Sequence, residues 1–210
     1  MDQKREIQIS KSLSKLLRHK LDSLPQGEIR GYVPVDSILA HAYLKSHHAN
    51  REDILKIVET NNKKRFGIKK INGIEYICAF QGHSKGGVDL TPLSKSNKNE
   101  IKMIVHGTNR NSWNSIKNEG LKPMKRTHVH FAKGLPKNIA KRLNFNGFEN
   151  DVISGMRSNV EIVIFLDIEK VIESGDFYLS ENGVILGSKV VPISFFKRVW
   201  DIDQGWIIEN

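Results

Sequence analysis

The chain has 210 residues, of which 39% are hydrophobic and 27% charged, a composition typical of a globular protein that excludes a collagen-like or disordered chain. Lys and Arg number 33 against 23 Asp and Glu, so the net charge is +10 and a polyanionic partner is favoured. The single cysteine, Cys78, excludes an intramolecular disulfide framework, and no stretch reaches the ~20 apolar residues of a membrane span. We therefore expect an intracellular protein, cytoplasmic or nuclear, with no membrane partner.

The N-terminal segment predicts an amphipathic helix. Apolar residues recur at helical spacing over residues 9–24, and Pro25 ends the pattern. Arg18 and His19 lie at the polar end of this helix, one turn after Ser14, so a hydroxyl and cations can project toward one anion. A solvated basic face explains the same residues without a ligand, and both interpretations stay open.

Two shorter helices follow. Asp36 can cap a helix over residues 37–44, and Asn50 can cap another over residues 51–60. Arg65 then enters a strand, where a fixed guanidinium could bind a phosphate through two hydrogen bonds. An exposed basic turn is the simpler explanation of Arg65 taken alone.

A β-hairpin completes the N-terminal lobe. Asn72-Gly73, flanked by the apolar segments 66–71 and 74–80, is the two-residue signal of a type I′ turn. Residues 1–100 hold 18 Lys and Arg against 11 Asp and Glu, so most of the positive charge lies in this half. Helices followed by a hairpin on a basic lobe is the order of a winged-helix module. Such modules usually bind nucleic acid, although many bind only protein.

Residues 82–99 are rich in Gly, Ser, Lys and Asn and have little apolar periodicity, which is typical of a surface linker. They predict two domains, residues 1–93 and residues 94–210. Gln81-Gly82-His83-Ser84 follows the hairpin directly. Its backbone amides could hold an anion, but the motif by itself favours the start of the linker.

The second domain combines short strands with few helices. Strands are predicted at residues 101–106, 129–132 and 160–167, with a β-rich stretch at 184–199. Helices are predicted at residues 112–119 and 168–174, each ended by a glycine. This pattern indicates an α+β fold rather than a doubly wound parallel sheet. Neither GxGxxG nor GxxxxGK[ST] is present, so a Rossmann site and a P-loop are not supported.

Histidines mark two of these strands. His106-Gly107-Thr108 ends the first, and His128 and His130 lie two apart on the second, where alternate side chains share a face. A metal ranks below an organic ligand there because no thiol or acidic cluster accompanies the pair. Partly buried histidines bonded to the backbone explain them equally well. Asn182-Gly183, taken alone, is a hairpin turn.

Seven short segments in order carry a resemblance that no single one of them does. They are SKSLSKLLRH (10–19), KKRF (63–66), AFQGHS (79–84), HGT (106–108), GLKPMKRTHVHFA (120–132), SGMR (154–157) and SENGVIL (180–186). Together they resemble the RNA 2′-phosphotransferase family, the NAD-dependent tRNA 2′-phosphotransferases. The resemblance implies an α+β protein with an N-terminal winged-helix-like lobe and a C-terminal ADP-ribosyltransferase-like lobe that has a split β-sheet and binds NAD⁺.

The resemblance also implies a reaction. An internal 2′-phosphate at a tRNA splice junction attacks C1″ of the nicotinamide ribose and expels nicotinamide, which leaves an ADP-ribosylated RNA 2′-phosphate. The ribose 2″-OH then attacks the phosphate and gives 2′-OH RNA and ADP-ribose 1″,2″-cyclic phosphate. NAD⁺ is consumed as a co-substrate, no metal is expected, and the partner is RNA with an internal 2′-phosphate. A site built from one chain requires no dimer, so we expect a monomer.

The resemblance assigns site residues position by position. The family's Arg-His-Arg-Arg tetrad, which would clamp the 2′-phosphate, falls on Arg18, His19, Arg65 and Arg157. Further substrate-binding candidates are Ser14, Lys20, Gln81 and His83. The NAD⁺-binding candidates are His106, Gly107, Thr108, His130, Asn182 and Gly183. Two positions depart from the family's pattern, because Cys78 stands where Arg is frequent and Gly187 where Thr is frequent.

Two other functions stay open. The chain could be an ADP-ribosyltransferase that modifies other nucleic-acid or protein acceptors, in which case label from NAD⁺ would stay on the acceptor. It could also be a non-catalytic winged-helix regulator that binds nucleic acid, with salt-dependent binding and no release of nicotinamide.

Overall fold

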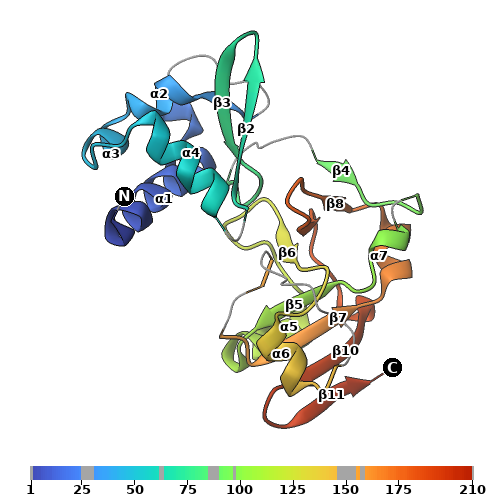
Figure 1. The fold of residues 1–210 in the computed structure, drawn as a ribbon. Helices are drawn as coiled ribbons and strands as arrows, with labels where there is room; N and C mark the ends of the chain where they lie inside the picture. The colour runs from blue at the N-terminus through green and yellow to red at the C-terminus, as the bar shows by residue number, and fades with distance from the viewer. Residues whose placement is uncertain are drawn as a thin grey trace. The chain divides into compact units, whose positions relative to one another are not determined.

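The chain forms two compact units, Met1–Asp89 and Leu90–Asn210 (Figure 1). The structure is a computed structural model that describes residues 2–24, 31–61, 64–84, 90–96, 98–145, 155–156 and 159–209. Each unit contains helices, antiparallel strands and an apolar core of its own, so the predicted α+β class is confirmed. None of the described helices combines the length and apolar character that a membrane-spanning segment needs.

The boundary between the units lies a few residues before the predicted one. Strand β4 (Thr91–Pro92) pairs with β8 (Phe177–Leu179), and Leu93 is buried in the core of the second unit. These residues were expected in a linker because their composition is polar and irregular. Pairing with a distant strand, which composition does not report, places them in the second unit.

The first unit is mainly helical and has one small antiparallel sheet in the order β1-β3-β2. Its helices are α1 (Gln3–His19), α2 (Val35–Leu39), α3 (Ala42–Lys45) and α4 (Arg51–Thr60). Its strands are β1 (Val33–Pro34), β2 (Phe66–Ile71) and β3 (Ile74–Ala79). The apolar face of α1 lies in the core with residues of α4 and the sheet, which fixes where the polar face of α1 can point.

Helix α1 ends at His19, earlier than the apolar pattern predicted. Lys20 leaves the helical conformation, and a 3₁₀ helix, Leu21–Ser23, follows. Leu21 and Leu24 still pack against the core, which is why the apolar periodicity continues past the end of the helix. Arg18 and His19 therefore occupy the last turn of α1, as predicted.

The predicted helix at 37–44 is two short helices, α2 and α3. His41 between them has an extended backbone (φ −72°, ψ 141°), and its Nδ1 accepts a hydrogen bond from Tyr43 N–H, which starts α3. Asp36 lies in the first turn of α2 rather than at its cap, because the helix begins directly after Pro34.

Helix α4 and the hairpin form as predicted. Asn50 and Asp53 make a reciprocal capping box: Asn50 Oδ1 accepts from Asp53 N–H at 2.9 Å, and Asp53 Oδ2 accepts from Asn50 N–H at 3.1 Å. Asn72 and Gly73 both have positive φ, 49° and 84°, as a type I′ turn requires. These local signals suffice because each acts within a few residues.

The second unit contains two antiparallel sheets, in the orders β11-β10-β7-β5 and β4-β8-β9-β6. The further strands are β5 (Val105–Thr108), β6 (Val129–Phe131), β7 (Ile162–Leu166), β9 (Ile185–Gly187), β10 (Phe196–Asp201) and β11 (Gly205–Glu209). The helices are α5 (Arg110–Glu119), α6 (Lys137–Arg142) and α7 (Ile168–Ser174). The sheets meet where Val105 N–H donates to Ala132 O at 3.0 Å and Ala132 N–H donates to Val105 O at 2.8 Å. This junction places the ends of β5 and β6 side by side.

The strand predicted at 101–106 begins only at Val105. Ile101, Met103 and Ile104 are buried in two different apolar clusters but lie outside any strand, so the apolar run predicted the burial of these residues and not their backbone pairing. Other short elements, such as α6, β8 and β11, were not predicted. The predicted helices at 112–119 and 168–174 are confirmed as α5 and α7, each followed by a glycine with positive φ.

The last residues of the chain, which the sequence analysis gave no role, complete a sheet. Arg110 at the start of α5 donates from Nε and Nη2 to the two carboxylate oxygens of Asp201 at 2.8 and 2.7 Å. It also pairs with Asp203 at 2.6 Å and Glu161 at 3.1 Å. Hydrogen bonds from Arg110 lower the pKa of the buried Asp201 to about 2, although burial opposes them. The hairpin β10–β11 is thereby tied to the segment that directly follows Thr108.

Candidate active site

The end of α1 and the segment after β3 form the first group of candidate residues. Ser84 N–H donates to Arg18 O at 3.0 Å, and Ser84 Oγ lies 3.3 Å from His19 Nδ1. Ser14 lies one turn before Arg18 on α1 and is partly exposed. Residues 81–84 therefore pack on the end of α1 instead of starting a linker, and that part of the linker prediction is wrong.

Gly82 explains how the chain turns onto α1. Its φ of +84° lies in the left-handed region that favours glycine, and a Cβ at this position would be 3.4 Å from Arg18 Cδ and Nε. The side chain of Arg18 thus lies directly against the backbone of Gly82. The residues on either side, Gln81 and His83, are 9% and 4% exposed. Burial of this segment depends on a contact with α1 that the residues 81–84 alone do not reveal.

Gln81 carries an oxygen that needs a hydrogen-bond donor. Its Oε1 is buried and makes no hydrogen bond with any residue that the structure describes. An unsatisfied buried acceptor typically costs about 1–3 kcal/mol, so such atoms mark places where a further group donates. A ligand hydroxyl or a bound water would satisfy it.

Arg65 lies directly before β2 and is hydrogen-bonded to Phe80, the residue that precedes the segment 81–84. Its backbone carbonyl accepts from Phe80 N–H at 3.0 Å, and its Nη1 lies 3.5 Å from Asn61 Oδ1. The side chain is half-buried, and burial lowers the pKa of the guanidinium, which nonetheless stays charged at neutral pH. Among the residues described, no carboxylate forms an ion pair with Arg65. A half-buried cation without a carboxylate suits a bound anion.

Lys20, the remaining candidate of the first unit, points to a different neighbour. Its Nζ donates to Tyr43 Oη at 3.2 Å, on α3. The structure thus brings Arg18, His19, Gln81 and His83 together around one chain segment, with Arg65 at Phe80. It places Lys20 beside them on the outer surface.

His106 and His130 form the second group of candidates, at the junction of the two sheets. His106 Nδ1 lies 2.9 Å from His130 O, and because a carbonyl only accepts, Nδ1 carries the proton. In the neutral ring Nε2 is then an acceptor. The ring of His106 also packs edge-on against Phe131 at 5.7 Å. Both histidines are partly exposed.

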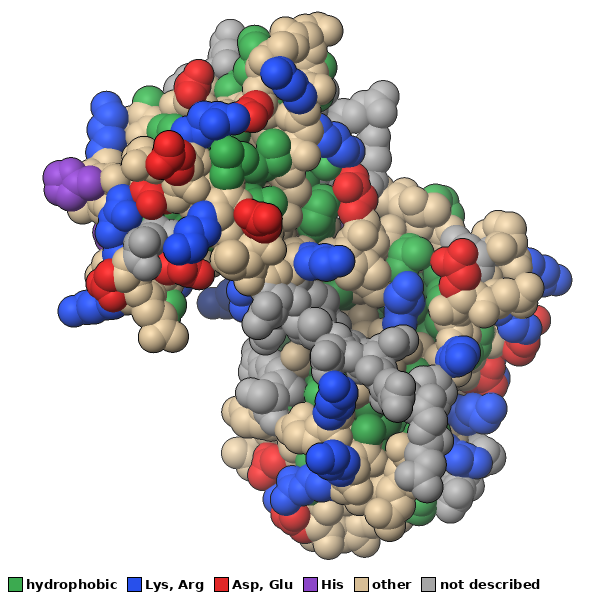
Figure 2. Space-filling view, viewed as in Figure 1, with side chains coloured by type: hydrophobic (Ala, Val, Ile, Leu, Met, Phe, Trp, Pro, Cys, Tyr) green, Lys and Arg blue, Asp and Glu red, His purple; other side chains and the backbone are tan. Residues whose placement is uncertain are grey.

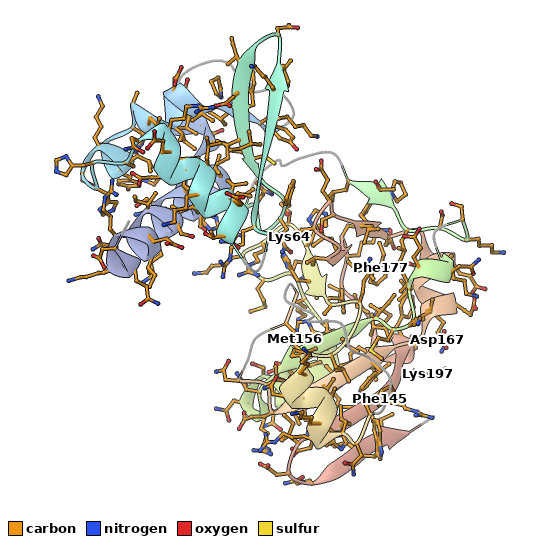
Figure 3. The ribbon with its side chains drawn as sticks, in the orientation of Figure 1. Lys64, Phe145, Met156, Asp167, Phe177 and Lys197 are labelled. Carbon is orange, nitrogen blue, oxygen red and sulfur yellow. The ribbon has the colours of Figure 1, made fainter. Side chains whose placement is uncertain are left out.

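Gly107 and Gly155 allow a later segment to lie across β5 and β6. A Cβ on Gly107 would be 2.5 Å from Val160 Cγ2 and 2.8 Å from Met156 Cγ. A Cβ on Gly155, which has φ +92°, would be 2.7 Å from Phe131 O. Gly155 and Met156 therefore lie directly on the strands that carry His106 and His130; of the two, Met156 is labelled in Figure 3. Arg157, the fourth member of the expected tetrad, lies outside the described residues.

Thr108 and the turn at Asn182-Gly183 complete the second group. Thr108 ends β5, and the next residue, Asn109, caps α5 by accepting from Ser112 N–H at 2.8 Å. Asn182 and Gly183 join β8 to β9, and Asn182 Oδ1 accepts from Ser180 Oγ at 2.8 Å. The hairpin-turn interpretation of this dipeptide is confirmed by the pairing of those two strands. Because β9 also pairs with β6, the turn belongs to the same sheet as His130.

Lys133 lies beside this turn and was missed by sequence reasoning. A Cβ on Gly183 would be 3.3 Å from Lys133 Cε and 3.6 Å from its Nζ, so the ammonium group lies close to the turn. The only sequence signal was its position directly after the strand that holds His130. A lone lysine after a strand is usually a solvated end, so the contact emerges only from the fold.

His128 has a different environment from His130. Its Nδ1 lies 2.8 Å from Thr127 Oγ1, and burial lowers the pKa of its ring. Within the described residues no three His, Cys, Asp or Glu side chains are grouped so that they could hold a metal ion.

Comparison with known proteins identifies one family that spans both units. The model of a family described as "RNA 2′-phosphotransferase, Tpt1 / KptA family" matches residues 4–189. The chain belongs to this family. The RNA 2′-phosphotransferase match therefore covers most of both units and every candidate residue named above.

Named relatives agree with the family match. A "Putative tRNA 2'-phosphotransferase" of Schizosaccharomyces pombe is 38% identical over 209 residues, 97% of this chain and 53% of that protein. A "tRNA 2'-phosphotransferase 1" of Danio rerio is 35% identical over 88% of this chain and 79% of its own length. The "tRNA 2'-phosphotransferase" of Saccharomyces cerevisiae is 35% identical over 93% of this chain and 84% of its own length. This chain thus spans about half the length of the S. pombe relative.

The two departures from the RNA 2′-phosphotransferase pattern are buried positions. Cys78 is fully buried in β3, and Gly187 in β9 would place a Cβ 3.1 Å from the ring of Phe177 and 3.3 Å from that of Phe131. Phe177 is labelled in Figure 3. Both substitutions therefore bear on packing in this chain, and neither is among the candidate residues.

Proposed function

We propose that this chain is an NAD-dependent RNA 2′-phosphotransferase that removes the internal 2′-phosphate at a tRNA splice junction. The observation that carries the proposal is the family match over residues 4–189, which includes the candidate residues of both units. The names of the relatives from S. pombe and S. cerevisiae support the same activity. The products are 2′-OH RNA, nicotinamide and ADP-ribose 1″,2″-cyclic phosphate.

The proposal assigns one task to each unit. The first, with its helices followed by the hairpin β2–β3, is a winged-helix-like lobe that binds RNA. The second, whose two antiparallel sheets meet at β5 and β6, is an ADP-ribosyltransferase-like lobe with a split sheet that binds NAD⁺. The charge distribution supports this division, since residues 1–89 hold 16 Lys and Arg against 10 Asp and Glu.

Residues of the first unit recognise the 2′-phosphate. A phosphate monoester is largely a dianion at neutral pH, and Arg18, His19 and Arg65 offer cations or donors for its oxygens. Arg65 is half-buried, so its charge interacts with an anion more strongly than it would in bulk water. Gln81 Oε1 accepts from a hydroxyl of the RNA, which would satisfy an atom that lacks a partner among the described residues.

Residues of the second unit fit NAD⁺. His106, whose ring orientation is fixed by the contact of Nδ1 with His130 O, contacts the nicotinamide ribose. Gly107 and Gly183 are kept as NAD⁺-binding candidates by the resemblance, and Lys133, whose Nζ lies beside Gly183, supplies a cation for the pyrophosphate. His130, Thr108 and Asn182 complete the set.

Bound NAD⁺ supplies an electrophilic ribose carbon that loses nicotinamide to the attacking 2′-phosphate, and then a 2″-OH that attacks phosphorus. The arginines hold the phosphate oxygens in place and stabilise the negative charge that grows on them as phosphorus is attacked. The distance of 3.3 Å between His19 Nδ1 and Ser84 Oγ supports a role for His19 in proton transfer. By the resemblance to the family, Arg157 is the fourth member of the tetrad.

The test mixes purified protein with a short RNA that bears one internal 2′-phosphate, with and without NAD⁺, in the presence of EDTA. We expect loss of the phosphate and release of nicotinamide, both dependent on NAD⁺ and independent of metal. RNA left unchanged while NAD⁺ is consumed would indicate another acceptor. If NAD⁺ is untouched and RNA still binds, the chain is a binding protein and the proposal is wrong.

Three further expectations belong to this proposal. The protein is a monomer, it needs no metal, and it works in the cytoplasm or the nucleus. Sedimentation at micromolar concentration tests the first of these, and the EDTA arm of the assay tests the second.

A further inference from the structure

Two lysines of the first unit converge on one tyrosine. Lys15 Nζ lies 4.6 Å from the ring centroid of Tyr43, and Lys20 Nζ lies 5.4 Å from it and donates to the phenol oxygen at 3.2 Å. Lys15 is on α1, Lys20 directly follows it, and Tyr43 is on α3. Both lysines are exposed. We call these three residues the lysine-tyrosine cluster.

The cluster gathers positive charge without a compensating carboxylate. Figure 2 shows Lys and Arg side chains interspersed with Asp and Glu over the helices of the first unit. Among the described residues, however, no Asp or Glu pairs with Lys15 or Lys20. Hydrogen bonds from Lys15 and Lys20 outweigh partial burial and lower the pKa of Tyr43. Two ammonium groups held on one ring repel each other, and a bound anion would relieve that repulsion.

Helix stability alone does not explain the cluster. A cation near the C-terminus of a helix is stabilising, which accounts for Lys20. Lys15 precedes the last turn of α1, where this effect has faded, yet its ammonium group also turns toward Tyr43. The convergence therefore calls for a second explanation.

The cluster adjoins the candidate phosphate site. Successive residues of an α-helix are rotated by about 100°, so Ser14, Arg18, Lys11, Lys15 and His19 follow one another within an arc of roughly 140°. Lys15 and His19 are one turn apart, with about 5–6 Å between their Cβ atoms. One polar strip of α1 thus runs from Arg18 and His19 to the cluster.

We propose that the lysine-tyrosine cluster binds the RNA backbone beside the nucleotide that carries the 2′-phosphate. Lys15 and Lys20 contact a phosphodiester of the flanking strand, and Tyr43 holds their ammonium groups together. Such contacts position the strand and carry no sequence information, which suits an enzyme that must accept different splice junctions. The inference rests on the proposed function for the identity of the substrate. It also assigns Lys20 to the flanking backbone rather than to the 2′-phosphate.

The first experiment measures binding without chemistry. The probe is a fluorescent single-stranded RNA of twelve nucleotides without a 2′-phosphate, titrated by anisotropy over a range of salt concentrations. For single strands the slope of log K against log salt changes by about 0.7 per phosphate contact, so losing this one phosphodiester contact in Lys15→Gln with Lys20→Gln should flatten the slope by about 0.7. Lys45→Gln, an exposed lysine on α3, is the matched control and should match wild type. Equal slopes in all proteins would overturn the proposal.

The second experiment separates the cluster from the chemistry. Lys15→Gln should raise KM several-fold for a 2′-phosphorylated RNA of twelve nucleotides and leave kcat and the kinetics of a 2′-phosphorylated dinucleotide unchanged. Tyr43→Phe should give a smaller rise in KM. Equal losses on the long and short substrates would contradict the assignment, with thermal melting used to check that each variant is folded. If wild type releases no phosphate from either RNA, the proposed function fails, while the anisotropy experiment still tests the cluster.

Discussion

At the scale of single residues, the side-chain oxygen of Gln81 should lower the stability of the fold while it contributes to binding of the RNA. Its Oε1 is buried and lacks a hydrogen-bond partner among the described residues. Gln81→Met keeps the side-chain volume and removes the unsatisfied oxygen, so we expect the free energy of unfolding to stay level or rise by up to about 1 kcal/mol. KM for 2′-phosphorylated RNA should rise at the same time. Thermal melting and steady-state kinetics of this one variant check both; a large loss of stability would mean that the oxygen already has a partner.

The most specific prediction about turnover concerns Arg65. Arg65→Ala removes a half-buried cation that we assign to the 2′-phosphate, and it should reduce turnover on the order of 10²–10³-fold. Arg65→Lys should recover little, because one ammonium group cannot make two parallel hydrogen bonds. The control is Arg51→Ala, an exposed arginine of the same unit that pairs with Glu75. Single-turnover rates that match wild type for Arg65→Ala would remove Arg65 from the site.

At the scale of elements, Gly107 tests how the segment at Met156 is held on β5. Gly107→Ala brings a Cβ to 2.5 Å from Val160 and 2.8 Å from Met156, and overpacking of this kind costs about 1–3 kcal/mol. We expect a lower melting temperature and weaker NAD⁺ binding by calorimetry.

Adding Val160→Ala to Gly107→Ala is the matched test of this cause. It removes the nearer methyl groups and should restore part of both losses. If the double variant is no better than the single one, the overlap with Val160 is not the reason for the defect.

The link between α5 and the C-terminal hairpin predicts a dependence on pH. The pKa of Asp201 is about 2 when folded against an ordinary 3.8, so its contribution to stability is complete above about pH 4 and is lost as the pH falls through 2. Between pH 5 and pH 2 the second unit should lose about 2 kcal/mol through this group. Asp201→Asn should remove that part of the pH dependence. Asp203→Asn, which changes an exposed partner of Arg110, should keep most of it.

Elements defined by short-range signals were predictable and those defined by distant contacts were not. The capping box at Asn50 and the turn at Asn72-Gly73 follow from residues a few positions apart, and both are present. The segment 81–84 looked like a linker because its burial comes from α1, more than 60 positions earlier in the chain. The pairing of Arg110 with Asp201 spans 91 positions, so no local sequence pattern predicts it.

Candidate site residues divide in the same way. The positions Arg18, His19 and Arg65 came from the resemblance to a family, and the structure adds their surroundings, such as the contact of Arg18 with Gly82. Lys133 was not among the predicted site residues, because its contact with Gly183 joins two loops at the ends of different strands. The proton on His106 Nδ1 is assigned from the distance between this nitrogen and the carbonyl of His130, which the sequence does not contain.

At the scale of the whole molecule, the two units should fold separately. Each has its own apolar core, and the contacts that define them divide the chain at Asp89. We expect the fragments Met1–Asp89 and Leu90–Asn210 to give cooperative thermal transitions alone, with RNA binding in the first and NAD⁺ binding in the second. Circular dichroism and calorimetry test this. A fragment that unfolds without a transition would mean that the units depend on each other for stability.

The sheet order β11-β10-β7-β5 has a genetic consequence. The family match ends at residue 189, but β10 lies after that point and covers one edge of β7, whose side chains are all buried. A nonsense mutation just beyond codon 189 would spare every candidate residue and still expose β7 as a long apolar edge strand. Such an allele would behave as a null through aggregation of its product, and supplying more NAD⁺ or RNA would not rescue it.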